Sequence, residues 1–287
     1  MNVAARVWEL IASPDPAASA QAVELAAALQ DPALFSALLR GCKIAEGTLR
    51  GNGLMPGGSW SERMSATTLR TLLGLIAEAP DDAAIDPSLR RAAITTLRVE
   101  VREGLDFPAS ARRLSALSRL NLRGNGLTEL PDSLAFFPAL AHLELPQNKL
   151  SALPAVVTRL SGLRILDLSF NPLAVLPAHI ARLSRLEVLT LSQTELTDLP
   201  PQMAAMESLA SLDLSRCPSL RALPPVVYEL PALAHLSLRS SRVRLRPADV
   251  ARLPALRRLE LNRGLYRDPP ALRAALKAQR PELATNL

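Results

Sequence analysis

Leucines recur at fixed intervals along the C-terminal two thirds of the chain. Copies of one pattern, L-x-x-L-x-L-x-x-N-x-L-x-x-L-P-x-x-ϕ-x-x-L, begin at Leu117, Leu140, Leu163, Leu186, Leu209, Leu233 and Leu256. Successive copies are 23 residues apart, except for one step of 24 after Leu209. A fixed period of this length is the signature of stacked repeat architectures. A less regular copy starts at Ile94, with its register shifted by one at Leu105, so we count eight copies, the last of them truncated.

Each copy predicts a short strand followed by a turn. In L-x-x-L-x-L the period of two places alternate leucines on one side, which is typical of a strand with one buried face. At the ninth position, Asn125, Asn148 and Asn171 could turn their side-chain amides onto backbone groups that the turn leaves unpaired. Later copies have weaker hydrogen-bonding groups there, or none: Thr194, Cys217, Ser241 and Gly264. We therefore expect this ninth-position ladder to weaken toward the C-terminus, with Cys217 buried and inert.

The second half of each copy predicts a short helical or 3-10 segment. It starts at a leucine–proline pair, whose prolines are Pro131, Pro154, Pro177, Pro200 and Pro224. Proline suits the first position of a helix because its missing N–H has no helical partner there. One repeat cannot bury its own apolar edge, so the inward leucines are predicted to form a core shared between neighbours.

This pattern resembles the leucine-rich repeat proteins of the bacterial and plant-intracellular type, with their L-P-x-x-ϕ-x-x-L signature. The resemblance covers about residues 94–269. It implies an α/β solenoid with a curved parallel sheet on the concave side and short helical or 3-10 segments outside. It also implies protein binding as the usual role, and no catalytic residue.

The two ends of the chain depart from the pattern. Residues 1–93 show helical periodicity in several stretches and predict an α-helical N-terminal cap, interrupted by a Gly-rich loop at 41–61. Within that loop Thr48–Leu54 nearly duplicates Asn121–Leu127, so a decayed repeat is an alternative to the favoured reading, an excursion unrelated to the ladder. Residues 270–287 are expected to form a capping helix and a tail, with Leu272 and Leu276 facing inward and the last residues, from Arg280, frayed.

Third, fifth and seventh positions of each copy are expected to point outward on the concave sheet. Ile165 and Val188 are aliphatic where the pattern requires nothing apolar, and Phe170 follows at an eighth position. Acidic side chains and hydroxyls surround them, with arginines on both flanks. The candidate partner-binding residues are His142, Glu144, Ile165, Asp167, Phe170, Val188, Thr190, Ser192, Asp213 and Ser215. The alternative is that β-branched residues simply favour strands and that the charges keep a solvated sheet soluble.

Composition argues for an aliphatic core and against a reactive site. Apolar residues make up 48% of the chain and aromatic residues 3%, so leucine, alanine and valine must fill the interior. Two cysteines and three scattered histidines offer no metal-ligand spacing. No nucleophile has a base nearby in sequence. We therefore expect no enzyme activity, no metal and no cofactor.

The net charge of +6 belongs to one end of the chain. Residues 239–287 hold 12 basic and 4 acidic side chains, whereas residues 94–238 hold 13 of each. An arginine ladder, Arg239, Arg242, Arg244 and Arg246, could seat phosphates. No aromatic residue is interleaved with it, so a solvated basic edge is favoured and nucleic-acid binding is disfavoured.

The sequence thus predicts a non-enzymatic module that binds a protein partner through the concave face. Its start lacks a secretory signal, and no apolar run reaches the ~18 residues of a membrane span, so a cytoplasmic monomer without membrane contact is expected. One alternative is a bacterial virulence effector of the type III kind, delivered into a host cell without a cleavable signal peptide and acting on a host protein or on host ubiquitination. A further alternative is phosphate or nucleic-acid binding by the C-terminal arginines.

Overall fold

The computed structural model describes residues 44–45, 48–50, 96–98, 105–107 and 109–287. The helices predicted within residues 1–93 lie outside the described residues. The chain divides into two compact units, the first covering the chain up to Asn125 together with Leu130–Leu140, and the second covering Gly126–Glu129 and Ala141–Leu287.

Four short strands belong to the first unit. Strand β1 (Ile44–Ala45) pairs antiparallel with β2 (Thr48–Arg50), and β2 pairs parallel with β3 (Thr96–Arg98). Strand β3 in turn pairs parallel with β4 (Arg119–Asn121). The favoured interpretation of residues 48–50, an excursion unrelated to the ladder, is therefore wrong. The same Thr-Leu-Arg sequence occurs in β2 and β3, and the two strands align residue for residue, so the decayed-repeat alternative fits better.

The first unit also contains an aromatic contact that fixes two of its loops. The rings of Phe107 and Phe137 meet edge to face with centroids 5.0 Å apart. Beside them, the backbone N–H of Phe107 donates to the hydroxyl of Ser133, which itself donates to Asp106 at 2.7 Å. Two 3-10 segments, η3 (Ala109–Arg113) and η4 (Asp132–Phe136), follow strands β3 and β4 along the chain. Edge-to-face packing of this kind stabilises beyond the buried area alone.

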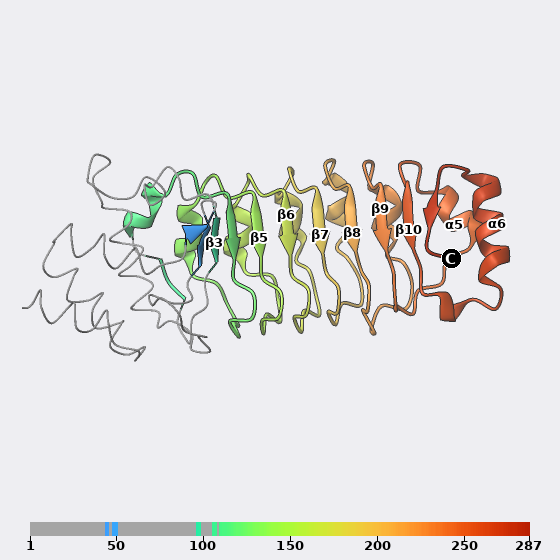
Figure 1. Cartoon of the computed structure of the whole chain (residues 1–287), viewed down its shortest axis with the longest axis horizontal. Coiled ribbons are helices and arrows are strands. Elements are labelled where there is room, and N and C mark those ends of the chain that lie inside the picture. The colour runs from blue at the N-terminus through green and yellow to red at the C-terminus, as the bar shows by residue number, and fades with distance from the viewer. Residues whose placement is uncertain (1–43, 46–47, 51–95, 99–104, 108) are drawn as a thin grey trace, which may run out of the picture. The chain divides into compact units, whose positions relative to one another are not determined.

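In the second unit, β5 to β10 lie side by side as parallel rungs (Figure 1). Their bounds are His142–Glu144, Ile165–Asp167, Val188–Thr190, Ser211–Asp213, His235–Ser237 and Arg258–Glu260. Equivalent pattern positions pair across every rung, including Ser211 with His235, where the sequence step is 24. The extra residue is therefore absorbed between the strands.

Short helical segments return the chain between these strands. They are the 3-10 segments η5 (Ala155–Arg159), η6 (Ala178–Arg182), η7 (Pro201–Ala205) and η8 (Pro225–Glu229), and the α-helical turn α5 (Pro247–Ala251). The predicted 3-10 segments are confirmed, but the pattern proline precedes each one instead of opening it. Pro177, with an extended ψ of 151°, is the N-cap of η6, and its carbonyl accepts the first 3-10 hydrogen bond from Ile180 at 3.0 Å.

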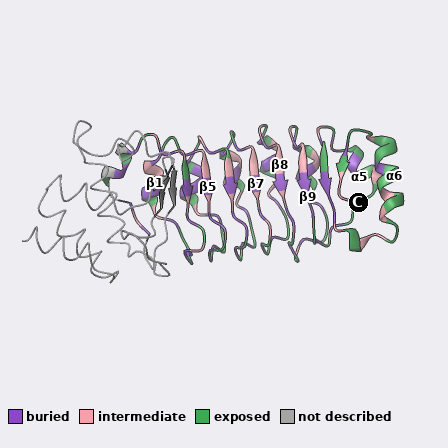
Figure 2. Cartoon of the chain, in the orientation of Figure 1, coloured by how far each residue is buried: buried purple, intermediate pink, exposed green. Residues whose placement is uncertain are grey.

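The leucine core follows the predicted periodicity. The central residue of each strand from β5 to β10 is buried, whereas both its neighbours are half-buried in β5 to β8 (Figure 2). In β6, for example, Leu166 is buried between the half-buried Ile165 and Asp167. Each rung adds its leucines to those of the next, which is how a solenoid builds a core that no single repeat could form.

The ninth-position ladder is also confirmed. The Asn148 amide donates to the carbonyl of Leu145 at 2.9 Å, and its oxygen accepts from the backbone N–H of Leu127 at 3.0 Å. Toward the C-terminus smaller groups hold the same place. The Thr194 hydroxyl donates to the carbonyl of Leu191 at 2.8 Å. The Cys217 thiol donates to the same carbonyl at 3.2 Å, although the sequence predicts little hydrogen bonding by a cysteine at this position.

The C-terminal residues are ordered, so the prediction of a frayed tail is wrong. Helix α6 (Pro269–Gln279) begins at the two prolines, and Leu276, one of its residues, is buried. After it, β11 (Ala284–Thr285) pairs parallel with β10, and Leu283 and Leu287 are buried. The tail thus adds a final half-rung to the sheet. The sequence pattern does not show this rung because residues 280–287 lack the leucine spacing of a repeat.

Candidate functional site

We use the term strand face for the surface of the second unit formed by the third, fifth and seventh pattern positions of β5 to β10. Nine of the ten candidate residues lie on it: His142, Glu144, Ile165, Asp167, Val188, Thr190, Ser192, Asp213 and Ser215. The tenth, Phe170, lies elsewhere. The pairing of the strands brings residues that are 23 or 24 positions apart in the sequence into single rows across this face.

An aliphatic pair occupies the middle of the strand face. Ile165 of β6 and Val188 of β7 are paired in register, and both are half-buried. Neighbouring strands lie about 4.8 Å apart, so the two side chains form one apolar patch. His142 and Ser211 flank the pair in the same row. The strand face therefore has an apolar centre within a row of polar side chains.

The row beside it is acidic. Asp167 and Asp213 lie on either side of Thr190, which places them about 10 Å apart by the ordinary strand spacing. Each aspartate accepts a hydrogen bond through one carboxylate oxygen from the backbone N–H two residues later, at 2.9 Å from Ser169 and 2.8 Å from Ser215. These bonds hold the carboxylates in a fixed orientation on the strand face.

The hydroxyls are less open than the sequence suggests. Ser215 is only 8% exposed, and its hydroxyl donates to that of Ser192 at 2.9 Å. Ser192 is half-buried. Ser192 is therefore the better placed of the two to meet a partner, and Ser215, in the next repeat, donates a hydrogen bond to it.

Phe170 does not lie beside the aliphatic pair. It follows the carboxyl end of β6 in a left-handed backbone conformation, with φ of 56°, and its side chain is 39% exposed. It lines a hollow of about 570 Å³ at that edge of the sheet. The other lining residues are Asn171, Pro172, Gln193, Thr194, Glu195, Arg216 and Pro218. None of them is at a third, fifth or seventh pattern position, so this hollow shares no residue with the strand face.

A buried carboxylate organises the C-terminal end of the strand face. Glu260, 8% exposed, accepts from Arg258 at 2.8 Å and from Arg239 at 3.1 Å. Burial raises the pKa of Glu260, but the hydrogen bond from Arg258 and the charge of Arg239 outweigh it, so its pKa lies below the ordinary value. The sequence analysis includes these arginines only as a basic flank of the sheet. The signal it missed is the acidic residue that the register places beside both.

A serine, a histidine and a glutamate also align here. The hydroxyl of Ser211 lies 3.2 Å from Nδ1 of His235, and Nε2 of His235 lies 3.9 Å from Glu260. A nucleophile array needs a base held by a hydrogen bond to its orienting acid. At 3.9 Å there is no such bond, and Glu260 is already neutralised by two arginines. These three residues therefore lack the geometry of a catalytic triad.

Two of the four ladder arginines are bound to carboxylates. Arg239 pairs with Glu260, and Arg246 pairs with Asp249 at 3.3 Å. The hydrogen bond from Arg246 lowers the pKa of Asp249. These contacts reduce the charge available to phosphate.

Cys217 is fully buried, and that burial raises the pKa of its thiol.

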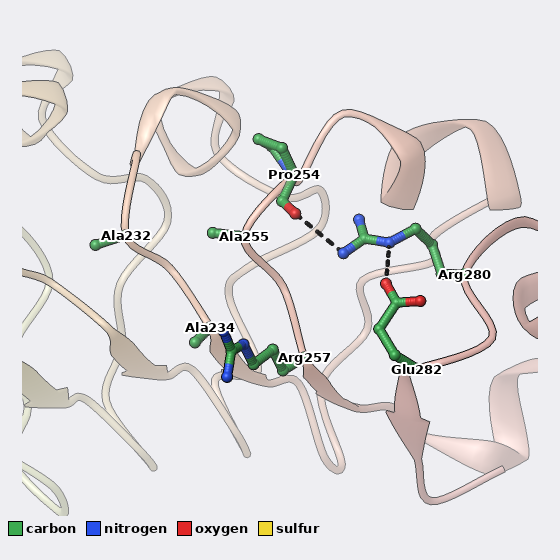
Figure 3. Close-up of a pocket in the computed structure, with 7 residues that line it drawn as sticks. All are labelled: Ala232, Ala234, Pro254, Ala255, Arg257, Arg280 and Glu282. Atoms are coloured by element: carbon green, nitrogen blue, oxygen red, sulfur yellow. Dashed lines mark hydrogen bonds and ion pairs between the residues drawn. The ribbon is translucent and has the colours of Figure 1, made fainter.

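A second hollow, of about 440 Å³, lies near the amino ends of β9 and β10 (Figure 3). Its lining includes alanines at 232, 234 and 255. Its charged rim includes Arg280, whose guanidinium donates to the carbonyl of Pro254 and to Glu282 (Figure 3). Two further bonds from Arg280 reach the carbonyls of Leu253 and Leu256. Arg280 is thus engaged in closing the last coil.

Two features are absent from residues 44–45, 48–50, 96–98, 105–107 and 109–287, which are the described part of the chain. Among them, no three His, Cys, Asp or Glu side chains gather closely enough to hold a metal ion. In the same part of the chain, no helix has both the length and the apolar character needed to cross a membrane.

Stacked 23-residue coils with a parallel strand, a ninth-position ladder and 3-10 returns define a leucine-rich repeat protein. Two family models described as leucine rich repeats match the chain, one over residues 161–218 and the other over residues 116–137. These matches and the architecture together support a leucine-rich repeat protein. The comparison with curated proteins found no match.

Similar solved structures include three proteins with leucine-rich repeats. A leucine-rich repeat protein of Leptospira interrogans is 24% identical, with a TM-score of 0.51, over 71% of this chain and 57% of its own. The leucine-rich repeat domain of the type III effector XopL is 26% identical, with a TM-score of 0.55, over 77% of this chain and 82% of its own. The ectodomain of the plant receptor kinase GASSHO1/SCHENGEN3 from Arabidopsis thaliana is 24% identical, with a TM-score of 0.46, over 68% of this chain and 24% of its own. The chain thus spans little more than half of the first of these proteins and a quarter of the last.

Proposed function

We propose that this chain is a non-enzymatic protein-interaction module that holds a protein partner on its strand face. The observation that carries the proposal is the aliphatic pair of Ile165 and Val188, set in register among polar side chains. Apolar side chains at the centre of a polar surface are where binding energy concentrates in protein interfaces. Leucine-rich repeat domains are commonly interaction modules, which agrees with this use of the face.

The partner should be complementary to this face. Asp167 and Asp213 flank the aliphatic pair with carboxylates that backbone bonds hold in place. A partner that presents an apolar side chain between basic ones would match both the patch and its acidic border. This proposal requires only contacts between the two surfaces and no reaction of the partner.

Replacing Val188 with glutamate tests this proposal. Partners are first captured from lysate on the intact chain and identified by mass spectrometry, and the purified partner is then titrated by calorimetry. We expect Val188→Glu to weaken its binding at least about tenfold, because a charge would be buried against an apolar anchor. Ala178→Glu adds the same charge on the exposed first residue of η6 and should leave binding unchanged.

Two outcomes decide the matter. Loss of binding in Val188→Glu, with an unchanged melting temperature and full binding by Ala178→Glu, supports the strand face. A folded Val188→Glu variant that binds the partner as tightly as the parent chain means that the strand face is not the contact surface.

A second candidate function is that of an effector delivered into a host cell. The likeness to the leucine-rich repeat domain of XopL, a type III effector, favours it. The chain would then bind a host protein through the same face. A fusion of the chain to a translocation reporter, expressed in a bacterium with a type III apparatus, should give signal inside host cells and none when the apparatus is deleted. No signal from the intact apparatus would exclude this route.

A further inference from the structure

A second apolar surface lies at the carboxyl-end edge of the sheet. Among the described residues, only two large hydrophobic side chains are exposed, Phe170 at 39% and Val175 at 64%. Both belong to the loop formed by residues 170–175. Between them Pro172 and Ala174 are also exposed, whereas Leu173 is buried in the core. The loop therefore concentrates the exposed apolar surface of the described chain at one place.

The backbone of this loop makes its aromatic residue unusual. The eighth position of successive repeats adopts φ between 53° and 58°, at Gln147, Phe170, Gln193, Arg216 and Ser240. Bulky side chains rarely adopt this left-handed conformation, and it costs on the order of 1 kcal/mol or more. The other four repeats place polar residues there. Folding therefore requires neither the ring of Phe170 nor its exposure, which points to a contact outside the fold.

The adjacent hollow supplies the rest of a binding surface. Pro172 and Pro218 form rigid parts of its wall, since proline fixes φ. Glu195 and Arg216, from the next two repeats, are exposed at its rim. No ion pair joins these two in the part of the chain that the structure describes. The hollow thus combines an apolar wall with one negative and one positive group.

We propose that this hollow receives an extended segment of a partner protein, with an aliphatic or aromatic side chain against Phe170 and Pro172. The segment would carry a carboxylate toward Arg216 and a basic side chain toward Glu195, since this arrangement complements both charges. A hollow of about 570 Å³ lies within the volume range of clefts that bind drug-sized ligands. This edge surface uses no residue of the strand face, so it extends the proposed function to a second contact.

Selection of peptides on the intact chain tests the proposal. The probe is a phage library of random dodecapeptides, and enriched peptides are synthesised and titrated by fluorescence anisotropy. Phe170→Gln is the decisive variant, because glutamine occupies the same position in both neighbouring repeats and fits the turn. We expect peptides with an apolar residue between opposite charges, and we expect Phe170→Gln to weaken them at least about tenfold. Arg216→Gln should weaken them through the peptide carboxylate.

The control is Val188→Glu on the strand face, which should leave these peptides bound. That result separates the edge surface from the strand face, since failure of one proposal leaves the other standing. The edge proposal is overturned if enriched peptides bind Phe170→Gln as tightly as the parent chain, or if they depend on Val188 instead. Selection that enriches no peptide sensitive to Phe170 also counts against it.

Discussion

The side-chain amide of Asn171 donates to the carbonyl of Leu145, one repeat earlier, at 2.9 Å. The same amide reaches the carbonyls of Leu168 and Ser169 in its own repeat, and its oxygen accepts from the backbone N–H of Leu150 at 3.0 Å. One buried side chain thus pairs four backbone groups of two successive coils. The ladder therefore couples each repeat to its neighbour as well as closing each turn.

Replacing Asn171 with alanine should lower the free energy of unfolding by about 3 kcal/mol, because buried backbone groups lose their partners. Urea denaturation followed by circular dichroism measures the change. Asn171→Thr is the matched control, because Thr194 keeps one such bond at the equivalent position. We expect it to lose less than the alanine variant. An alanine variant as stable as the parent chain would contradict this role.

The pairing of Glu260 with two arginines predicts a specific response to acid. Its pKa lies below the ordinary 4.5, so its stabilising contribution is fully present above that value and is lost as the pH falls through the folded-state pKa. Glu260→Gln removes the charge and keeps the shape. We expect it to lower the free energy of unfolding by about 1 kcal/mol at neutral pH, with a difference that shrinks below pH 4.5. Denaturation at a series of pH values measures this, and a difference independent of pH would show that the charge contributes nothing.

The repeat core could be predicted because its signal is periodic. Leu166 and its equivalents recur at a fixed step, and a shared core follows from that step alone. The rung at residues 284–285 could not be predicted, since it lacks the leucine pattern, and strand pairing alone reveals it. Phe170 was placed with the strand face because it is close to Ile165 in sequence. The left-handed turn after β6 places it at the sheet edge instead. The hydrophobic pattern does not predict the conformation of a turn.

The candidate site, like the fold, was predictable from the sequence only where it follows the repeat period. The rows of the strand face, such as Ile165 with Val188, follow directly from the repeat register. The partners of single side chains do not. Arg239 and Arg258 form a basic flank in sequence, but Glu260 pairs with both. Ser215 is expected to point outward, but it is buried and donates a hydrogen bond to Ser192. The partner of a long side chain depends on its position in three dimensions, which the spacing of residues along the sequence does not specify.

Cys217 is predicted to resist thiol reagents in the folded chain. Burial raises the pKa of its thiol above the ordinary 9.0, and the thiolate is the reactive form. In a Cys42→Ser background, which leaves Cys217 as the only cysteine, Ellman's reagent should react on the order of 100-fold more slowly with the folded chain than with the chain in denaturant. Rapid labelling of the native chain would show that the ladder position opens easily.

The same thiol predicts a loss of stability in alkali. A raised folded-state pKa means that its contribution is complete below about pH 9 and disappears as the pH rises through the folded value. The background chain should therefore lose stability above pH 9. Cys217→Thr, with no thiol to ionise and a side chain already used at position 194, should show a smaller loss over that range. Equal losses in the two chains would assign the alkaline effect to other groups.

Arg280 is predicted to stabilise the C-terminal closure. Its guanidinium donates to the carbonyls of Leu253, Pro254 and Leu256 at 2.9 to 3.0 Å, so it binds the coil that precedes β10 to the segment after α6. Arg280→Ala leaves these carbonyls without that donor and should lower the local stability by about 2 kcal/mol. Hydrogen exchange should then accelerate at the backbone N–H of Ala284, which donates to the backbone carbonyl of Arg257. Lys277→Ala, which removes a positive charge from the exposed side of α6, should leave that exchange unchanged. If both variants exchange like the parent chain, the final half-rung is held by its buried leucines, and Arg280 has no measurable part in closing the sheet.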